Sequence, residues 1–159
     1  TAIYGFPSIN ETRCMQDSPH RYVATASALE GEPASIRGSD LPEIISDTPL
    51  QFGGPGGHWS PEELLMAAVA DSFVLNFRDA AQADEFAWRA IECRAEGVLA
   101  QAEHTTQFTS IILAVELMVG AEADRARAEE LLKTAAEASL IIRTLSAGTE
   151  LVTEIAVAE

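Results

Sequence analysis

Two cysteines and three histidines are the side chains of this sequence that most readily act as nucleophiles or metal ligands. A thiol attacks electrophiles as the thiolate, which a neighbouring cation stabilises. Cys14 follows Arg13, which could lower the pKa of its thiol, but no partner base stands beside it. Cys93 falls on the apolar side of an expected strand, where a thiol usually behaves as an inert small hydrophobe. Cys14 is therefore the candidate reactive cysteine.

Metal and cofactor chemistry find little support in the sequence. His20, His58 and His104 lie in three separate loops, and none has a second histidine or a cysteine two or four residues away. The glycine-rich run at 53–57 lacks the GxxxxGK[ST] pattern of a phosphate-binding loop, and no GxSxG elbow occurs. We therefore expect neither a metal nor a cofactor.

The charge balance excludes several classes of partner. Ten Lys and Arg residues oppose 25 Asp and Glu residues, so the chain of 159 residues has a formal net charge of −15. Such a chain repels phosphate backbones and anionic membrane surfaces, and no apolar run reaches the ~20 residues that span a bilayer. We expect no nucleic acid and no membrane as partners. Two cysteines are too few for a disulfide framework, which favours a reducing cytoplasmic location.

The elements that would position these residues begin after an irregular lead-in. Residues 1–20 show no period and are interpreted as an N-terminal arm, which leaves 21–159 as a single domain. Short apolar segments at 22–29 and 34–38 predict two strands. Residues 39–59 are rich in proline and glycine and are expected to form a loop.

The clearest local signal is the start of a helix at Ser60. Ser60 can cap the first free N–H groups, Pro61 suits the first helical position, and Glu63 completes a capping box. The helix is expected to run to about Ala83. Its residues 64–70 are apolar on nearly all sides, which favours coverage by a second subunit.

Alternating apolar residues predict two further strands, at 88–101 and 108–119, joined as a hairpin. A second helix is expected from near Ala121 to a C-cap at Gly148, with Ser139 on its apolar face. A last strand is expected at 149–157. This order of strands, helix, hairpin, helix and strand is typical of an α+β domain.

The stretch from Gly53 to Phe73, GGPGGHWSPEELLMAAVADSF, resembles the motif of the OsmC/Ohr family. In that family a glycine-rich loop, a [SN]PEEL-like cap and an alanine-rich helix lead to a cysteine followed by an aromatic residue. The stretch at 135–145 is similar to the family's second helix, which carries another cysteine. With the hairpin and the final strand, the resemblance covers about residues 21–158.

The resemblance implies an α+β OsmC-like fold, in which antiparallel sheets wrap around two long central helices of an intertwined homodimer. Many members of this family are bacterial thiol-dependent peroxidases that reduce organic hydroperoxides in the oxidative stress response. One cysteine attacks the peroxide and the other resolves it, while an Arg and a Glu activate the first.

This sequence departs from the family at the reacting positions. By the resemblance, Ser72 stands where the attacking cysteine is expected and Ser139 where the resolving cysteine is expected. Glu62 matches the family Glu, and Arg21 is the nearest counterpart of the Arg, with Arg13 as another candidate. A serine hydroxyl is not ionised at pH 7 without a base and has no sulfenic state, so the peroxide cycle cannot run on these residues. Glu62 and Ser72 also stand ~15 Å apart along one straight helix.

Three functions remain open at this point. In the first, an apolar slot at the dimer interface, with polar groups from Ser72, Asn76 and Ser139, binds a small apolar or amphipathic ligand. In the second, the protein is a hydroperoxide reductase that uses Cys14 as a displaced nucleophile. In the third, it is a non-catalytic structural or partner-binding homologue whose serines fill the core, each bonded to a carbonyl one turn back.

Overall fold

The computed structural model describes residues 19–102 and 104–158. The chain divides into two compact units, Thr1–Ile45 and Ser46–Glu159. Arg13, Cys14 and the rest of the expected arm up to residue 18 lie outside the described residues. None of the helices within the described part of the chain has the length and apolarity needed to cross a membrane.

The three N-terminal strands form a small sheet in the order β1-β2-β3. Strand β1 (Ala24–Ser27) pairs antiparallel with β2 (Ala34–Gly38), and Gly31, at φ +79°, forms the turn between them. The strand expected at 22–29 is thus shorter than predicted, whereas that at 34–38 is confirmed. Strand β3 (Ile44–Ser46) lies in a segment that we expected to be a loop, and this expectation was wrong. The short 3-10 helix η1 (Leu50–Phe52) also lies there.

Helix α1 (Pro61–Ala83) begins and ends where the sequence predicts. Ser60 Oγ accepts a hydrogen bond from the Glu63 N–H at 3.2 Å, and the Glu63 carboxylate accepts one from the Ser60 N–H at 2.9 Å. This capping box satisfies two N–H groups that would otherwise lack partners. Fully buried side chains repeat every fourth residue along the helix and include Val69, Phe73, Phe77 and Ala81.

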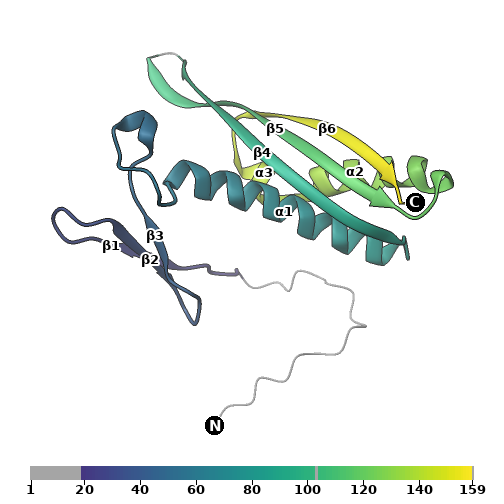
Figure 1. Cartoon of the computed structure of the whole chain (residues 1–159), viewed down its shortest axis with the longest axis horizontal. Coiled ribbons are helices and arrows are strands. Elements are labelled where there is room, and N and C mark those ends of the chain that lie inside the picture. The colour runs from purple at the N-terminus through teal and green to yellow at the C-terminus, as the bar shows by residue number, and fades with distance from the viewer. Residues whose placement is uncertain (1–18, 103, 159) are drawn as a thin grey trace, which may run out of the picture. The chain divides into compact units, whose positions relative to one another are not determined.

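A second sheet, in the order β4-β5-β6, packs against α1 (Figure 1). Strands β4 (Trp88–Ala102) and β5 (Thr105–Val119) form the predicted hairpin and pair antiparallel. Strand β6 (Gly148–Val157) runs parallel to β5, so this sheet is mixed rather than antiparallel throughout. The parallel pairing follows from the helical connection between β5 and β6, which returns the chain to the end at which β5 began.

The sequence predicts a single helix between 121 and 148, and this prediction is wrong in detail. A 3-10 turn η2 (Glu122–Asp124) leads into α2 (Arg125–Ala138), and a separate short helix α3 (Leu140–Thr144) follows. Ser139 breaks the helix because its backbone is extended, at φ −67° and ψ 111°. Its side chain accepts a hydrogen bond from the Ile142 N–H at 3.3 Å and thereby caps α3.

An ion pair connects α2 with the end of α1. Arg127 donates a hydrogen bond from Nε to Asp84 Oδ2 at 2.6 Å, and its Nη2 also contacts this carboxylate. The guanidinium holds the pKa of Asp84 below its ordinary value through this hydrogen bond. Because the pair is largely exposed, it contributes to orientation more than to stability.

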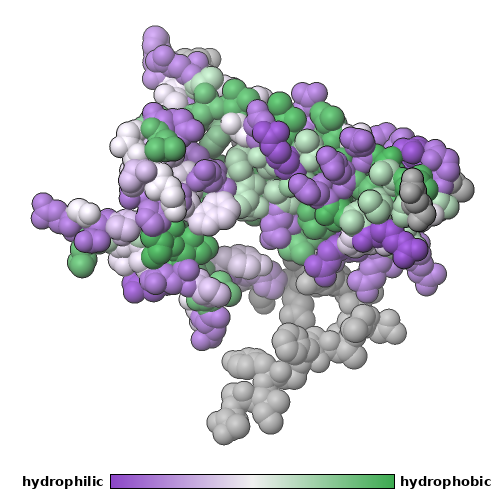
Figure 2. Space-filling view, viewed as in Figure 1, coloured by the Kyte–Doolittle hydropathy of each residue, from purple (hydrophilic) through white to green (hydrophobic). Residues whose placement is uncertain are grey.

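The outer face of the second sheet carries three glutamates in one cross-strand row. Glu92 pairs with Glu116 in the β4–β5 register, and Glu116 pairs with Glu154 in the β5–β6 register. All three are exposed. Hydrophilic and hydrophobic side chains are mixed on the face that Figure 2 shows. Like charges directly opposite each other destabilise a sheet.

We expect Glu116→Lys to stabilise the protein, because it turns two repulsive cross-strand pairs into two attractive ones. The free energy of unfolding should rise by about 1 kcal/mol at low salt, and by less at high salt. Urea denaturation at both ionic strengths measures this change, and Glu116→Gln, which only removes the repulsion, should give about half of it. An unchanged or lower midpoint for Glu116→Lys at low salt would contradict the expectation.

Candidate functional site

Ser72 and Ser139 are in direct contact. Ser72 lies on α1 and Ser139 precedes α3, and their hydroxyl oxygens are 2.8 Å apart. Ser139 is fully buried, whereas Ser72 is partly exposed. The two serines are 67 residues apart in the sequence, and their hydrogen bond connects α1 with the α2–α3 junction.

Asn76 joins this pair from one helical turn further along α1. Its side-chain amide donates to the Ser72 carbonyl oxygen at 2.7 Å and approaches the Ser72 hydroxyl at 3.4 Å. The Ser139 hydroxyl also accepts from the Ile142 N–H, and either hydroxyl can donate the one hydrogen bond that links the two serines. The hydroxyls thus bond to each other instead of each relying on a carbonyl one turn back.

The chemistry available to this cluster is limited. In the part of the chain that the structure describes, no histidine or carboxylate takes part in the hydrogen bonds of Ser72, Asn76 and Ser139. A serine acts as a nucleophile only when a general base removes its proton. The arrangement therefore supports polar packing or binding rather than covalent catalysis.

The other two residues implied by the family resemblance are not part of the cluster. Glu62 lies in the first turn of α1 and Ser72 lies ten residues later on the same unbroken helix, which separates them by ~15 Å. Arg21 is exposed and belongs to the first unit. Within the chain, the structure thus brings together Ser72, Asn76 and Ser139 and keeps Glu62 apart from them.

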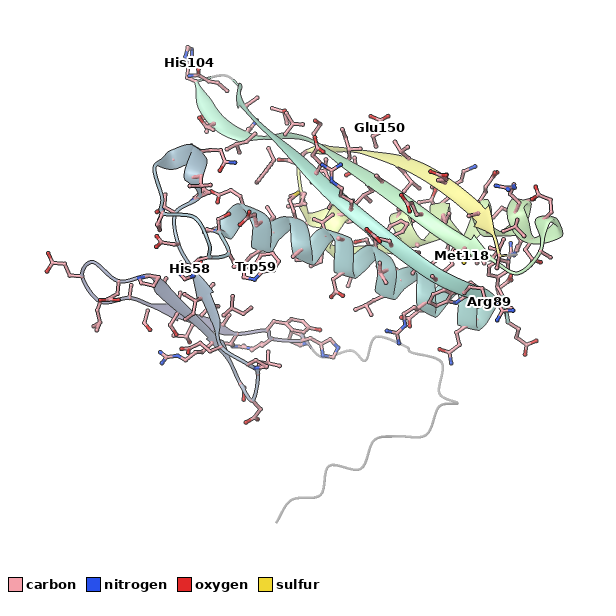
Figure 3. All side chains as sticks on the ribbon, in the orientation of Figure 1. His58, Trp59, Arg89, His104, Met118 and Glu150 are labelled. Carbon is pink, nitrogen blue, oxygen red and sulfur yellow. The ribbon has the colours of Figure 1, made fainter. Side chains whose placement is uncertain are left out.

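A cavity of about 400 Å³ lies where the first half of α1 faces strands β4 and β5. Trp59, half exposed, stands at the N-terminal end of α1 (Figure 3). Neither Ser72 nor Ser139 lines this cavity, so sequence reasoning missed it. The lining residues come from the loop before α1, from α1 and from the hairpin, and are Trp59, Glu62, Glu63, Met66, Ala67, Ala70, Ala95, Gly97 and Phe108.

Gly97 is the sequence signal that could have indicated the cavity. A Cβ atom at this position would lie 2.7 Å from Phe108 Cε1 and 2.8 Å from Met66 Sδ, which is closer than van der Waals contact allows. A glycine within a strand often marks such a close approach. Here it makes room for the Phe108 and Met66 side chains at the cavity wall.

The two carboxylates of the wall differ in their contacts. Glu63 is engaged in the capping box with Ser60. Glu62 Oε2 is shielded from solvent and has no hydrogen-bond partner among the described residues of this chain.

Cys93 lies on the inner face of a strand and the histidines lie outside the strands and helices, as the sequence predicts. Cys93 points inward from β4 and is half-buried, and burial raises the pKa of its thiol to about 11. His104 lies at the tip of the β4–β5 hairpin and His58 beside Trp59 (Figure 3). Within residues 19–102 and 104–158, no group of three or more His, Cys, Asp or Glu side chains is arranged to hold a metal ion.

Comparison with known proteins places this geometry in context. Residues 54–154 match the family pattern described as OsmC-like protein. No curated protein matches the chain significantly. An OsmC-like protein of unknown function from Vibrio cholerae is similar in structure, with a TM-score of 0.72, 18% identity, and coverage of 87% of this chain and 99% of that one.

Two further solved structures are organic hydroperoxide resistance proteins. The protein from Legionella pneumophila has a TM-score of 0.66 and 20% identity, and the match covers 87% of this chain and 98% of that one. OhrB of Bacillus subtilis has a TM-score of 0.61 and 18% identity, with coverage of 86% and 98%. At these identities the likeness establishes the α+β fold.

The contact between the serines predicts that cysteines at the same positions form a disulfide. In a background of Cys14→Ser and Cys93→Ser, we expect Ser72→Cys with Ser139→Cys to oxidise within the chain, because atoms 2.8 Å apart need only a small shift to reach disulfide bonding distance. Thiol titration and intact mass before and after reduction measure the bond. The matched control pairs Ser139→Cys with Asp71→Cys, whose side chain is exposed on the same turn of α1. Equal oxidation of both pairs would contradict the geometry.

The raised pKa of Cys93 predicts slow modification of its thiol. In Cys14→Ser protein at pH 8, Cys93 should react with Ellman's reagent on the order of a hundredfold more slowly than a free cysteine, because so little of it is thiolate. The rate should rise about tenfold per pH unit until the pH reaches the pKa. In urea, where the thiol is exposed, the rate should match that of free cysteine. Rapid reaction of the folded protein would show that Cys93 is accessible and ionised.

Proposed function

This chain belongs to the OsmC-like protein family, and we propose that it binds a small apolar or amphipathic ligand instead of reducing hydroperoxides through a cysteine pair. The hydrogen bond between Ser72 and Ser139 carries the part of the proposal that concerns the loss of cysteine chemistry, and the cavity beside α1 supports the ligand. The family resemblance assigns the attacking and resolving cysteines to these two positions.

A hydrogen-bonded pair of hydroxyls cannot replace a dithiol. Peroxide reduction by cysteines needs a thiolate that is oxidised to a sulfenic acid and a second thiol that condenses with it. Serine reaches neither state. Ser139 also caps α3 through the Ile142 N–H, which gives its hydroxyl a structural role.

Two of the structural neighbours are organic hydroperoxide resistance proteins, which makes peroxide reduction the alternative function for this chain. For this chain, Cys93 is a poor substitute for the missing thiols, since burial raises its pKa to about 11. The cavity between α1 and the β4–β5 hairpin supports ligand binding, because its volume of about 400 Å³ falls within the usual range for small-molecule sites and most of its wall is apolar.

We further propose that the protein acts as a homodimer. Leu75 on α1 and Leu140 on α3 are 43% and 61% exposed, although they lie close in sequence to the serine pair. A second copy that covers this side of α1 would bury both leucines and close the partly exposed Ser72 to solvent. The free thiol of Cys93 fits a reducing, cytoplasmic location for such a dimer.

Consumption of cumene hydroperoxide in the presence of dithiothreitol tests the loss of peroxidase function. We expect wild-type protein, Cys14→Ser and Cys93→Ser to match the protein-free blank, because no thiol stands at the reacting positions. The double variant Ser72→Cys with Ser139→Cys places thiols at both positions. It should consume cumene hydroperoxide faster than the blank.

Turnover by wild type that disappears in Cys14→Ser would overturn the proposal in favour of a displaced nucleophile. Turnover that disappears in Cys93→Ser would do the same for the buried thiol.

A further inference from the structure

The cavity beside α1 is lined by very small residues from two elements. Ala67 and Ala70 line it from α1, and Ala95 and Gly97 line it from β4, which packs alongside this helix (Figure 1). Because none of the four carries more than a Cβ atom, the helix and the strand present little more than backbone to the cavity. A molecule between them meets two shallow walls, and close contact with both walls favours a planar body.

Phe108 supplies an aromatic surface next to these walls. A Cβ atom placed on Gly97 would lie 2.7 Å from Phe108 Cε1 and 2.8 Å from Phe108 Cδ1. Since these neighbouring ring atoms are almost equally distant, the side of the ring, rather than its tip, lies along the strand at Gly97. Met66 Sδ lies 2.8 Å from the same point, so the thioether sulfur is held at the same place in the cavity wall.

Trp59 adds a second aromatic ring to the wall. It lies in the loop before α1, is half exposed, and lines the cavity together with Phe108 and Met66 (Figure 3). An aromatic ring that packs against another ring gains attraction beyond the burial of its area, and so does a ring beside a thioether sulfur. The wall therefore offers three groups that favour an aromatic ligand over a saturated one.

We propose that the ligand of this cavity is a planar aromatic compound, whose ring lies between α1 and β4 and contacts Phe108, Met66 and Trp59. This inference rests on the proposed ligand-binding function and adds the chemical class of the ligand. A saturated ring or an alkyl chain would also bury apolar surface here, but it would not gain the contacts between rings. Preference for an aromatic over a saturated skeleton is therefore the property to measure.

Three neutral alcohols of equal carbon number separate aromatic recognition from apolar burial. 2-Naphthol is planar and aromatic, decahydro-2-naphthol has the same fused-ring skeleton in saturated form, and 1-decanol is linear. Both saturated alcohols are more hydrophobic than 2-naphthol, so burial alone would make 2-naphthol the weakest ligand. Isothermal titration calorimetry at pH 7 measures the affinities. We expect 2-naphthol to bind at least about fivefold more tightly than either saturated probe.

Variants with a folded circular dichroism spectrum locate the effect. Phe108→Leu keeps an apolar side chain but removes the ring, so it should weaken 2-naphthol binding about fivefold and leave decahydro-2-naphthol binding nearly unchanged. Phe86→Leu is the matched control, because Phe86 is partly buried in the same unit and is not one of the lining residues. Ala70→Leu, which fills the cavity from α1, should weaken all probes by more than about tenfold. Ala90→Leu, at an exposed position of β4, controls for the added side chain.

The outcomes distinguish this inference from the function on which it rests. Equal or tighter binding of the saturated probes would overturn the aromatic ligand and leave the ligand-binding function standing. Equal losses for 2-naphthol in Phe108→Leu and Phe86→Leu would also overturn it, because the ring in the cavity wall would then have no special part. Unchanged 2-naphthol binding by Ala70→Leu would show that the aromatic ring binds outside the cavity. Binding of none of the probes would overturn the ligand-binding function itself.

Discussion

The side chains of Val69, Phe73, Phe77 and Ala81 are fully buried on one line of α1, and their burial fixes the rotation of that helix. Phe77 adds an edge-to-face contact with Trp88 of β4, with ring centres 5.5 Å apart. Burial of one aromatic side chain of this size contributes about 2 kcal/mol or more. A rotation of α1 would expose both phenylalanines. Their burial therefore also determines which residues the other faces of the helix contact.

Both functional features follow from this constraint. Because the buried side chains of α1 face the core, Ser72 and Asn76 lie at the α2–α3 junction. There the Ser139 hydroxyl forms its hydrogen bond with Ser72. The face that carries Glu62, Met66 and Ala70 turns towards the hairpin, and Gly97 keeps β4 from filling the space between them. The capping box fixes where α1 begins and occupies the Glu63 carboxylate.

The sequence predicts the parts of the fold that depend on local chemistry. The start of helix α1 is predicted to the residue because its Ser-Pro-Glu-Glu motif is a signal carried by adjacent side chains. The break at Ser139 is missed because helical spacing of apolar residues continues through it, and only the contact with Ser72 shows why the serine turns into a cap. The parallel direction of β6 is missed because alternation is the same in parallel and antiparallel strands. The cavity depends on how a helix and a hairpin separate in space, which no local pattern encodes.

Serines at Ser72 and Ser139 offer a different chemistry from the cysteines that the family resemblance expects at these positions. Two thiols at this contact can be oxidised to a disulfide, whereas two hydroxyls can form only a hydrogen bond. In this chain that hydrogen bond connects Asn76 and Ser72 with Ser139 and the backbone of α3, and thus ties the two helical segments together. Because these polar groups already have partners within the protein, the cluster offers a ligand few free donors or acceptors, and the apolar cavity beside α1 is the better place for the proposed ligand.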